Sequence, residues 1–271
     1  MLLPLSSRLR LLVLLLFLVG CAATPLAPAP TVDIITLNLW NDQADWPARL
    51  GVIADTLGAL RPDVIVLQEV LQDSAKGLAN QAETLGARLG YAVVFASVDG
   101  PERAKRYGNA ILSRHPVLDT SWVRLRPLTD YRVAAHARLD IGGRPLDVVA
   151  THLHHTMEGG AIRAEQVADL VALLDQTAGA RWVVAGDFNA PADAPELSPL
   201  ADRAADAFGT LHPGAAVSTL VEALGHTPRR IDHVFAGPGL TPEAARLVLA
   251  EPVGGVQPSD HRGVWVRLRW P

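Results

Sequence analysis

Acidic, amide and imidazole side chains recur along this chain at the ends of apolar runs. Hard cations such as Mg²⁺ prefer oxygen ligands, typically one or two carboxylates with waters and phosphate oxygens. Glu69 is a strong candidate for such a ligand. The pattern therefore predicts a metal site with acid–base groups beside it. Six short segments carry these residues: Asn38, Glu69, His152, Asp187 with Asn189, Asp232, and Asp260 with His261.

The spacing of these residues suggests how they could divide the work. Asp187 and Asn189 lie two positions apart, so in extended backbone they point the same way. One of them could orient a water or a metal while the other holds a phosphate oxygen. His152 and His261 could act as general acid and base. Asp232 could orient one imidazole and fix its tautomer.

Hydrophobic periodicity places these residues within an alternation of strands and helices. Strands outnumber helices and polar residues cluster at strand ends, which predicts a layered α/β domain with its site along one sheet edge. Periodicity alone leaves open whether there is one sheet or two. Strands are expected at 32–40, 64–67, 91–96, 109–113, 133–139, 146–151, 182–185, 231–236 and 263–269, and helices at 46–60, 76–89 and 161–174.

Composition and charge limit the class of protein. Hydrophobic residues make up 49% and charged residues 19% of the 271 positions, which is typical of a globular chain. The net charge is −4, and nearer −6 without the first 20 residues, because Arg8 and Arg10 lie there. This balance argues against a dedicated DNA-packaging or repressor role, although a local basic groove stays open. The lone cysteine, Cys21, cannot form an intrachain disulfide.

The first 20 residues have the form of an export signal. Two arginines precede the apolar run 11–19, which is too short to cross a bilayer comfortably. Leu18-Val19-Gly20-Cys21 then resembles a bacterial lipobox, so we expect a lipid on Cys21 and a Pro- and Ala-rich tether over residues 21–31. An ordinary cleaved signal peptide and an uncleaved anchor stay open. The expected product is an exported, membrane-anchored monomer whose domain spans 32–271.

Seven short sequence segments, taken in the order in which they occur, resemble the endonuclease/exonuclease/phosphatase superfamily. The likeness extends from about Val32 to Trp270. It implies a four-layered α/β sandwich, deoxyribonuclease I-like, with two packed mixed sheets flanked by helices. The segments are Asn38 in Leu-Asn-Leu-Trp, Gln68-Glu69-Val70, 108–114, Thr151-His152-Leu153, Gly186-Asp187-Phe188-Asn189, Arg230-Ile231-Asp232-His233 and Ser259-Asp260-His261.

The resemblance also implies a metal centre. Glu69 would bind Mg²⁺ or Mn²⁺, with Asn38 beside it and Asp260 near the metal. A dense group of His152, His154 and His155 leaves zinc binding as an alternative. The neighbouring sequence segments match an oxygen-rich Mg²⁺ site better than a zinc site.

The catalytic roles that the resemblance implies surround that metal. His261, held by Asp232, would activate or orient the attacking water. Asp187 and Asn189 would position the nucleophile and the phosphate. His152 would contact the scissile phosphate and protonate or stabilise the leaving oxygen.

The expected activity is metal-dependent hydrolysis of a phosphoester, and a histidine at position 152 favours the branch with deoxyribonuclease I, sphingomyelinases and 5-phosphatases. Nucleic acid, phospholipid head groups and small organic phosphates stay open as substrates. A non-catalytic surface lipoprotein that uses the fold for binding is the alternative. Arg132 could face the site. Three further cations could hold a substrate phosphate or belong to a solvated loop: Arg103, Lys105 and Arg106.

Overall fold

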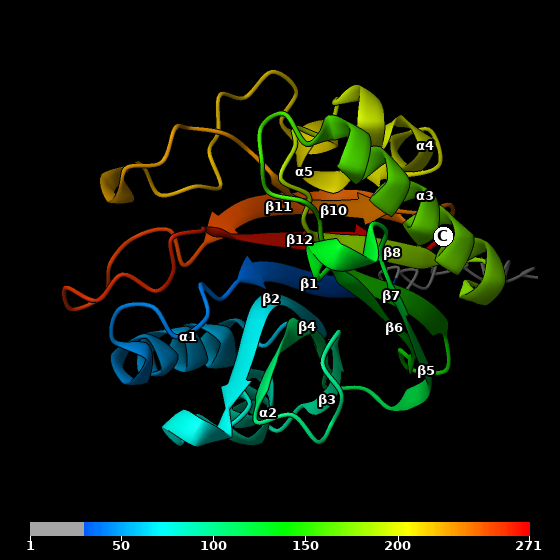
Figure 1. The fold of residues 1–271 in the computed structure, drawn as a ribbon. Helices are drawn as coiled ribbons and strands as arrows, with labels where there is room; N and C mark the ends of the chain where they lie inside the picture. Colours follow the sequence, from blue (N-terminus) through cyan, green and yellow to red (C-terminus); the bar gives the residue numbers. More distant parts are fainter. Residues whose placement is uncertain (1–29) are drawn as a thin grey trace, which may run out of the picture.

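The computed structural model describes residues 30–271 and arranges them around two six-stranded sheets (Figure 1). The predicted export signal, Cys21 and nearly all of the predicted tether lie outside the described residues. Within the described part, no helix combines the length and the apolar character needed to cross a membrane.

The first sheet has the strand order β11-β12-β1-β2-β4-β3. Its central strands β1 and β2 are parallel and its other neighbours are antiparallel, so the sheet is mixed. Its strands are β1 (Thr31–Asn38), β2 (Val64–Asp73), β3 (Ala92–Ser97), β4 (Lys105–Ser113), β11 (Thr241–Val248) and β12 (Gly263–Arg269).

The second sheet has the order β5-β6-β7-β8-β10-β9 and is also mixed, because only β7 and β8 are parallel. Each sheet thus contains one parallel pair near its middle. The strands of the second sheet are β5 (Val117–Arg124), β6 (Val133–Asp140), β7 (Pro145–His152), β8 (Trp182–Asp187), β9 (Ala205–Asp206) and β10 (Asp232–Ala236).

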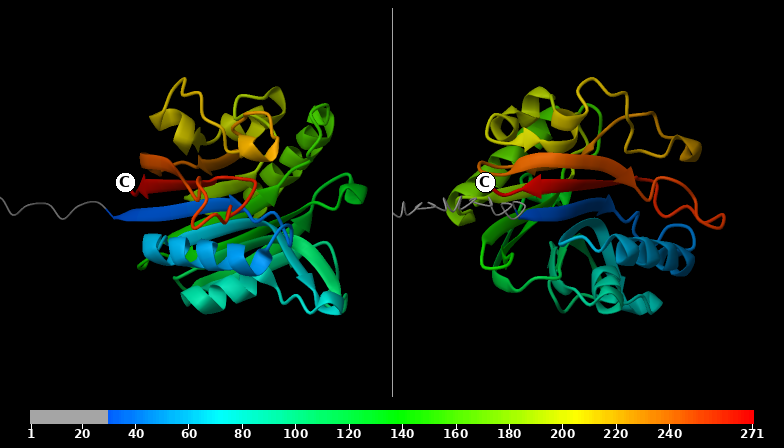
Figure 2. Two further views of the ribbon diagram at one scale, coloured as in Figure 1. Left: turned by 90° about the vertical axis from the view of Figure 1, so that its left-hand side faces the viewer. Right: turned by 180° about the vertical axis from the view of Figure 1, so that it is seen from behind.

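Helices cover the outer faces of the two sheets. Helices α1 and α2 pack on the first sheet, and α3 and α4 pack on the second (Figures 1 and 2). This arrangement confirms the predicted sandwich of two packed mixed sheets flanked by helices. The helices are α1 (Trp46–Leu60), α2 (Gln81–Leu89), α3 (Gly160–Thr177), α4 (Ser198–Ala201) and α5 (Ala207–Leu211), with 3₁₀ turns at Ser74–Lys76, Leu128–Asp130, Pro195–Leu197 and Glu222–Leu224.

Strand alternation explains the layers. Successive side chains of a strand point to opposite faces of its sheet. In β1, Ile34 belongs to the core between the sheets and Ile35 to the core beneath α1. In β7, Val148 and Val149 divide in the same way between the inner core and the core beneath α3. Both sheets are therefore apolar on both faces, as their unbroken hydrophobic runs require.

The parallel pairs determine where polar side chains can gather. Asn38 ends β1 beside Gln68 of β2, and His152 ends β7 beside Asp187 of β8. Asp232 begins β10, but because that strand runs antiparallel to β8, Asp232 also pairs with Asp187. Residues from five strands thus reach one end of the molecule.

The structure also corrects several expected elements. Strands β5 and β11 were not expected, and both lie at sheet edges, where half-exposed side chains blur the pattern. Strand β9 and helices α4 and α5 are too short for hydrophobic periodicity to reveal. The helix expected over 76–89 begins at Gln81, because a 3₁₀ turn and the left-handed Gly77 (φ 69°) precede it.

Candidate active site

The predicted site residues meet at the end of the molecule defined by the strand termini. Asn38 donates hydrogen bonds to Glu69 of its own sheet and to Asp187 of the other sheet. Beside them is a cleft of about 430 Å³. It is lined by Glu69, Arg132, His152, His155, Asp187, Asn189, Leu220, His226, Arg229, Ile231 and His261.

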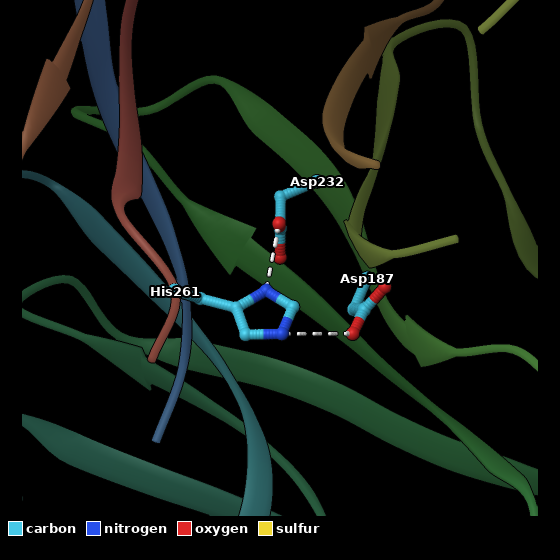
Figure 3. A group of neighbouring side chains, drawn as sticks. All are labelled: Asp187, Asp232 and His261. Carbon is cyan, nitrogen blue, oxygen red and sulfur yellow. Dashed lines mark hydrogen bonds and ion pairs between the residues drawn. The ribbon is translucent and has the colours of Figure 1, made fainter. Parts of the chain in front are cut away.

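A carboxylate–imidazole–carboxylate arrangement lies at the centre (Figure 3). Nδ1 of His261 lies 2.9 Å from Oδ2 of Asp232, and Nε2 lies 3.8 Å from Oδ2 of Asp187. All three residues are buried, and Oδ1 of Asp232 has no hydrogen-bond partner. The Asp232 contact fixes the orientation of the ring. The backbone N–H of Asp232 donates to Oγ1 of Thr219, which holds the carboxylate's own strand end.

Several nitrogen atoms face the carboxylate of Asp187. Nδ2 of Asn38 donates to Oδ2 at 3.1 Å, and the backbone N–H of Asn189 donates to Oδ1 at 2.9 Å. Nε2 of His152 lies 3.4 Å from the same Oδ2. Burial and the nearby charge of Asp232 raise the pKa of Asp187 to about 7, despite these contacts and the charge of His261.

The surroundings shift the pKa values of the two site histidines in opposite directions. Burial alone would lower the pKa of His261, but the surrounding carboxylates, that of Asp232 foremost, raise it to about 10. Burial and the charge of Arg132 lower the pKa of His152 well below its ordinary value, and its Nδ1 has no partner. This shift favours the neutral form of His152 beside Asp187.

Local backbone strain directs Glu69 and Asn189 toward the cleft. The pairing of β2 with β4 shifts register between Leu67 and Val70, and Glu69 within this bulge has a φ of 55°. Bulges of this kind redirect a side chain. Asn189 has a φ of 54° and donates from Nδ2 to the Leu153 carbonyl. Left-handed backbone at non-glycine residues concentrates at functional sites.

Glu69 is held by two amides. Nδ2 of Asn38 donates to Oε1 at 3.3 Å, and Nδ2 of Asn41 donates to Oε2 at 2.9 Å. Oδ1 of Asn38 accepts from the backbone N–H of Trp40, which fixes the amide orientation because an N–H can only donate. In this arrangement Asn38 bridges the carboxylates of Glu69 and Asp187 through its nitrogen. Its role as a metal ligand stays a prediction.

Asp260 lies at the margin of the site. Its Oδ2 is 3.4 Å from Nε2 of His226, and Oγ of Ser259 donates to its Oδ1 at 3.4 Å. Burial raises the pKa of Asp260, and the charge of Glu69 adds to this effect. Ser259 also donates to the carbonyl of Asn38 at 2.7 Å, which ties the loop of Asp260 to the end of β1.

The donor set fits a divalent cation. Ligand atoms of Asp187, Asp232 and His261 all lie within 4.8 Å of one another, and among residues 30–271 this is the group that could hold an ion. Glu69 adds a further carboxylate to the cleft. A cation would offset the crowding of negative charge that raises the pKa of Asp187. The roles predicted for Glu69 and Asp260 as its ligands stay predictions.

The other candidates divide between the cleft and the scaffold. Arg132 lines the cleft, as expected. His154 points elsewhere, because its ring nitrogens lie 2.8 Å from Asp130 and 2.9 Å from Thr156. Arg103 and Lys105 line a neighbouring hollow of about 820 Å³. Arg106 instead stacks on the Phe95 ring.

Arg49 is an important residue that the sequence interpretation missed. It is only 1% exposed, and its guanidinium lies over the rings of Trp40 and Trp46. It donates to the Leu39 carbonyl at 2.7 Å and to the Pro258 carbonyl at 3.0 Å. Further donations reach the carbonyls of Trp40, Asn41 and Gln43.

These contacts give Arg49 a positioning role. One group joins the loop after β1, which carries Asn41, to the loop before β12, which carries Asp260 and His261. Its place on the apolar stripe of α1, three residues after Trp46 and one before Leu50, was the available signal.

A model of the Endonuclease/Exonuclease/phosphatase family matches residues 35–261. Among curated proteins the chain has no match.

Solved structures share the fold at low identity. A Beutenbergia cavernae endonuclease/exonuclease/phosphatase is 24% identical, with a TM-score of 0.70 over 89% of this chain and 72% of that one. A humanized D. rerio TDP2 is 21% identical, with a TM-score of 0.73 over 88% and 99%. The human nocturnin catalytic domain is 21% identical, with a TM-score of 0.70 over 90% and 96%.

The Asp232–His261 contact predicts a pH-dependent contribution to stability. Because the folded pKa of His261, about 10, exceeds its ordinary 6.5, the stabilisation is complete below pH 6.5 and is lost as pH rises through about 10. Asp232→Asn removes the main cause, so the His261 pKa should fall and this loss of stability should shrink. NMR titration of the imidazole in metal-free protein, with urea unfolding across the same range, measures both.

A matched control for that experiment is Asp147→Asn. Asp147 holds the buried His136 at 2.8 Å and belongs to no part of the cleft. It should leave the His261 titration unchanged. An unmodified protein whose His261 titrates near its ordinary pKa would contradict the electrostatic account.

Removing the guanidinium of Arg49 should be costly. Arg49→Met leaves five carbonyls without their donor, so we expect a loss of about 3–5 kcal/mol in the free energy of unfolding. Arg267→Met is the control, because Arg267 is 44% exposed in its pair with Asp33 and should lose about 1 kcal/mol or less. Equal losses of unfolding free energy for the two variants in urea would show that the buried hydrogen bonds of Arg49 contribute no more than an exposed ion pair.

Proposed function

Since the chain belongs to the Endonuclease/Exonuclease/phosphatase family, we propose that it is a divalent-metal-dependent phosphodiesterase. The observation that carries this proposal is the arrangement of Asp232, His261 and Asp187 beside Glu69 in one cleft. The family comprises hydrolases of phosphoester bonds. These side chains supply the carboxylates and the imidazole that such a hydrolysis needs.

The nitrogen atoms around Asp187 indicate where a phosphate would lie. Nitrogens of Asn38, His152 and His261 all face its Oδ2. A phosphate in the cleft would meet the same donors, which could stabilise charge on its non-bridging oxygens. Arg132 lines the cleft beside His152 and adds a positive charge.

The chain's own residues have distinct proposed roles. Asp232 orients His261, whose Nε2 donates toward the attacking water or the phosphate. Asp187, with Asn189 beside it, holds the water in line for attack and accepts its proton. Neutral His152 can donate to the leaving oxygen. A bound Mg²⁺ or Mn²⁺, with Glu69 as the first candidate ligand, would supply electrostatic stabilisation of the developing charge.

The neighbouring hollow supports a substrate with more than one anionic group. Asn41 connects the two spaces, because it lines the hollow and donates to Glu69 of the cleft. Arg103 and Lys105 line the same hollow and are exposed. Among structures with the same fold, D. rerio TDP2 has been solved with a single-strand DNA product and human nocturnin with a sulfate anion. These features favour a nucleic acid or another polyanion over a simple monoester.

Location is a separate part of the proposal. The lipobox-like Leu18-Val19-Gly20-Cys21 supports an exported protein that is anchored to a membrane through Cys21. The tether over residues 21–31 would hold the catalytic domain near that membrane, as a monomer.

Metal-dependent hydrolysis tests the catalytic claim. With bis(p-nitrophenyl) phosphate and Mg²⁺, Glu69→Gln and His261→Ala should each lower kcat/KM by about 100-fold or more, because both groups act at the reacting phosphate. A chelator should abolish turnover of the unmodified protein.

Two substitutions at residues that do not line the cleft serve as controls for hydrolysis. Glu222 is exposed in its pair with Arg262, and His212 contacts a backbone carbonyl of β11. Glu222→Gln and His212→Asn should therefore retain activity. The absence of metal-dependent turnover, or turnover that ignores the Glu69 and His261 changes, would favour a non-catalytic binding protein.

Lipid attachment is tested by labelling cells that express the full chain with a fatty acid. The unmodified protein should incorporate label and sediment with membranes, whereas Cys21→Ser should incorporate none, because Cys21 is the only thiol. Equal labelling of both proteins would reject the anchor.

A further inference from the structure

A second cationic hollow lies at the end of the molecule opposite the catalytic cleft. Its volume is about 590 Å³, and Arg61, Arg88, Arg114 and His115 line it together with Tyr91. Arg61 follows α1, Arg88 lies in the last turn of α2, and the other two follow β4. Three separate elements thus bring their cations to one place.

Most of this charge has no acidic partner. Asp63 binds Arg114 Nε at 3.0 Å and lies 2.6 Å from Nε2 of His115. Arg61 and Arg88 are exposed, and neither has a carboxylate within 4.0 Å among residues 30–271. The hollow therefore presents at least two uncompensated guanidinium groups to solvent.

Helix dipoles account for only part of this cluster. A cation at the carboxyl end of a helix is favourable, which explains Arg61 and Arg88 individually. Arg114 and His115 follow a strand instead, and their contacts with Asp63 hold them at the same hollow. Convergence from several elements is what a site for an anionic group requires.

The cluster lies at the end where the N-terminal segment joins the domain. Ile34 of β1 pairs with Val64 at the beginning of β2, so the connection from Arg61 to β2 lies at the same end of the sheet as the beginning of β1. Asn38, at the other end of β1, belongs to the catalytic site. The seven-residue rise of β1 separates these ends by about 23 Å. Figure 2 shows the beginning of β1 on the side away from the loops before α1 and β12.

We propose that this basic cluster, defined by Arg61, Arg88, Arg114 and His115, docks on the phosphate head groups of an acidic lipid bilayer. Charge complementarity supports this partner, and a local cluster is needed because the chain as a whole is at −4. The length of chain before Pro30 also supports it, since nine residues from Cys21 span at most about 30 Å. An anchored domain would therefore stay within reach of the bilayer at this end.

This orientation deepens the proposed function and rests on it for one consequence. With the basic cluster on the bilayer, the catalytic cleft faces the aqueous side. The substrate would then be a polyanion arriving from solution rather than a lipid of the same membrane. The docking itself does not depend on hydrolysis.

Vesicle binding tests the docking. The full chain carrying Cys21→Ser, and so no attached lipid, is mixed with vesicles of phosphatidylcholine alone or with 30 mol% phosphatidylglycerol, on the order of physiological acidic content. We expect stronger partitioning to the acidic vesicles, weakened by salt. Arg61→Gln with Arg88→Gln should reduce the acidic partitioning by about thirtyfold, whereas Arg61→Lys with Arg88→Lys should retain it.

The control removes the same charge from the other end. Arg103→Gln with Lys105→Gln changes two exposed cations beside the catalytic cleft and should leave vesicle binding nearly unchanged. An equal loss in both pairs, a loss only in the control pair, or no preference for acidic vesicles would each overturn the proposal. Hydrolysis of bis(p-nitrophenyl) phosphate by the Arg61/Arg88 variant, expected to be normal, shows separately whether the catalytic proposal holds.

Discussion

The burial of Asp187 and Asp232 on adjacent strands is the constraint around which the site is arranged. Two carboxylates in register, both about 1% exposed or less, repel each other in a medium that screens weakly. Protonated His261 lies between them and compensates part of this charge, while Asn38 and the backbone of Asn189 donate to Asp187. The compensation is incomplete, as the raised pKa of Asp187 shows. A bound cation would offset this imbalance, and the donor set of the cleft fits one.

Backbone geometry at the strand ends makes this concentration of charge possible. Gly186 has a φ of 154°, and a Cβ there would lie 2.0 Å from the carbonyl oxygen of Thr151, so only glycine lets β7 and β8 approach beside Asp187. Glu69 reaches the cleft from a bulge, and Asn189 from a left-handed residue just beyond β8. Each irregularity interrupts a regular ladder where a side chain must turn inward. Arg49 then holds the two loops around these ends with a single buried group.

The sequence predicted the central strands well because they are buried on both faces. The inner strands, such as the one ending at Asp187, are unbroken runs of apolar residues, and the polar residue after each run indicates where the strand ends. β5 was not predicted because most of its side chains are exposed, including Leu118 and Trp122, and this weakens the apolar pattern. For the site, residue types and order identified the groups that could act. They could not reveal that Asn38 presents nitrogen rather than oxygen, because that depends on a backbone N–H two residues away. Nor could they reveal the partners of Arg49, which lie up to 209 positions distant.

Strand polarity relates the two ends of the molecule. The proposed catalytic residue Asn38 ends β1, and Glu69 lies at the bulge of its parallel neighbour β2, where the register places it beside that end. The residue that begins β1 must then lie at the far end of the same sheet, where Pro30 accepts a hydrogen bond from the N–H of Trp270. Any segment that precedes β1 therefore joins the domain away from the cleft. An N-terminal tether can restrain the domain there without obstructing the approach of substrate, and cations at that end can bind an anionic surface without competing with the catalytic site for a phosphate.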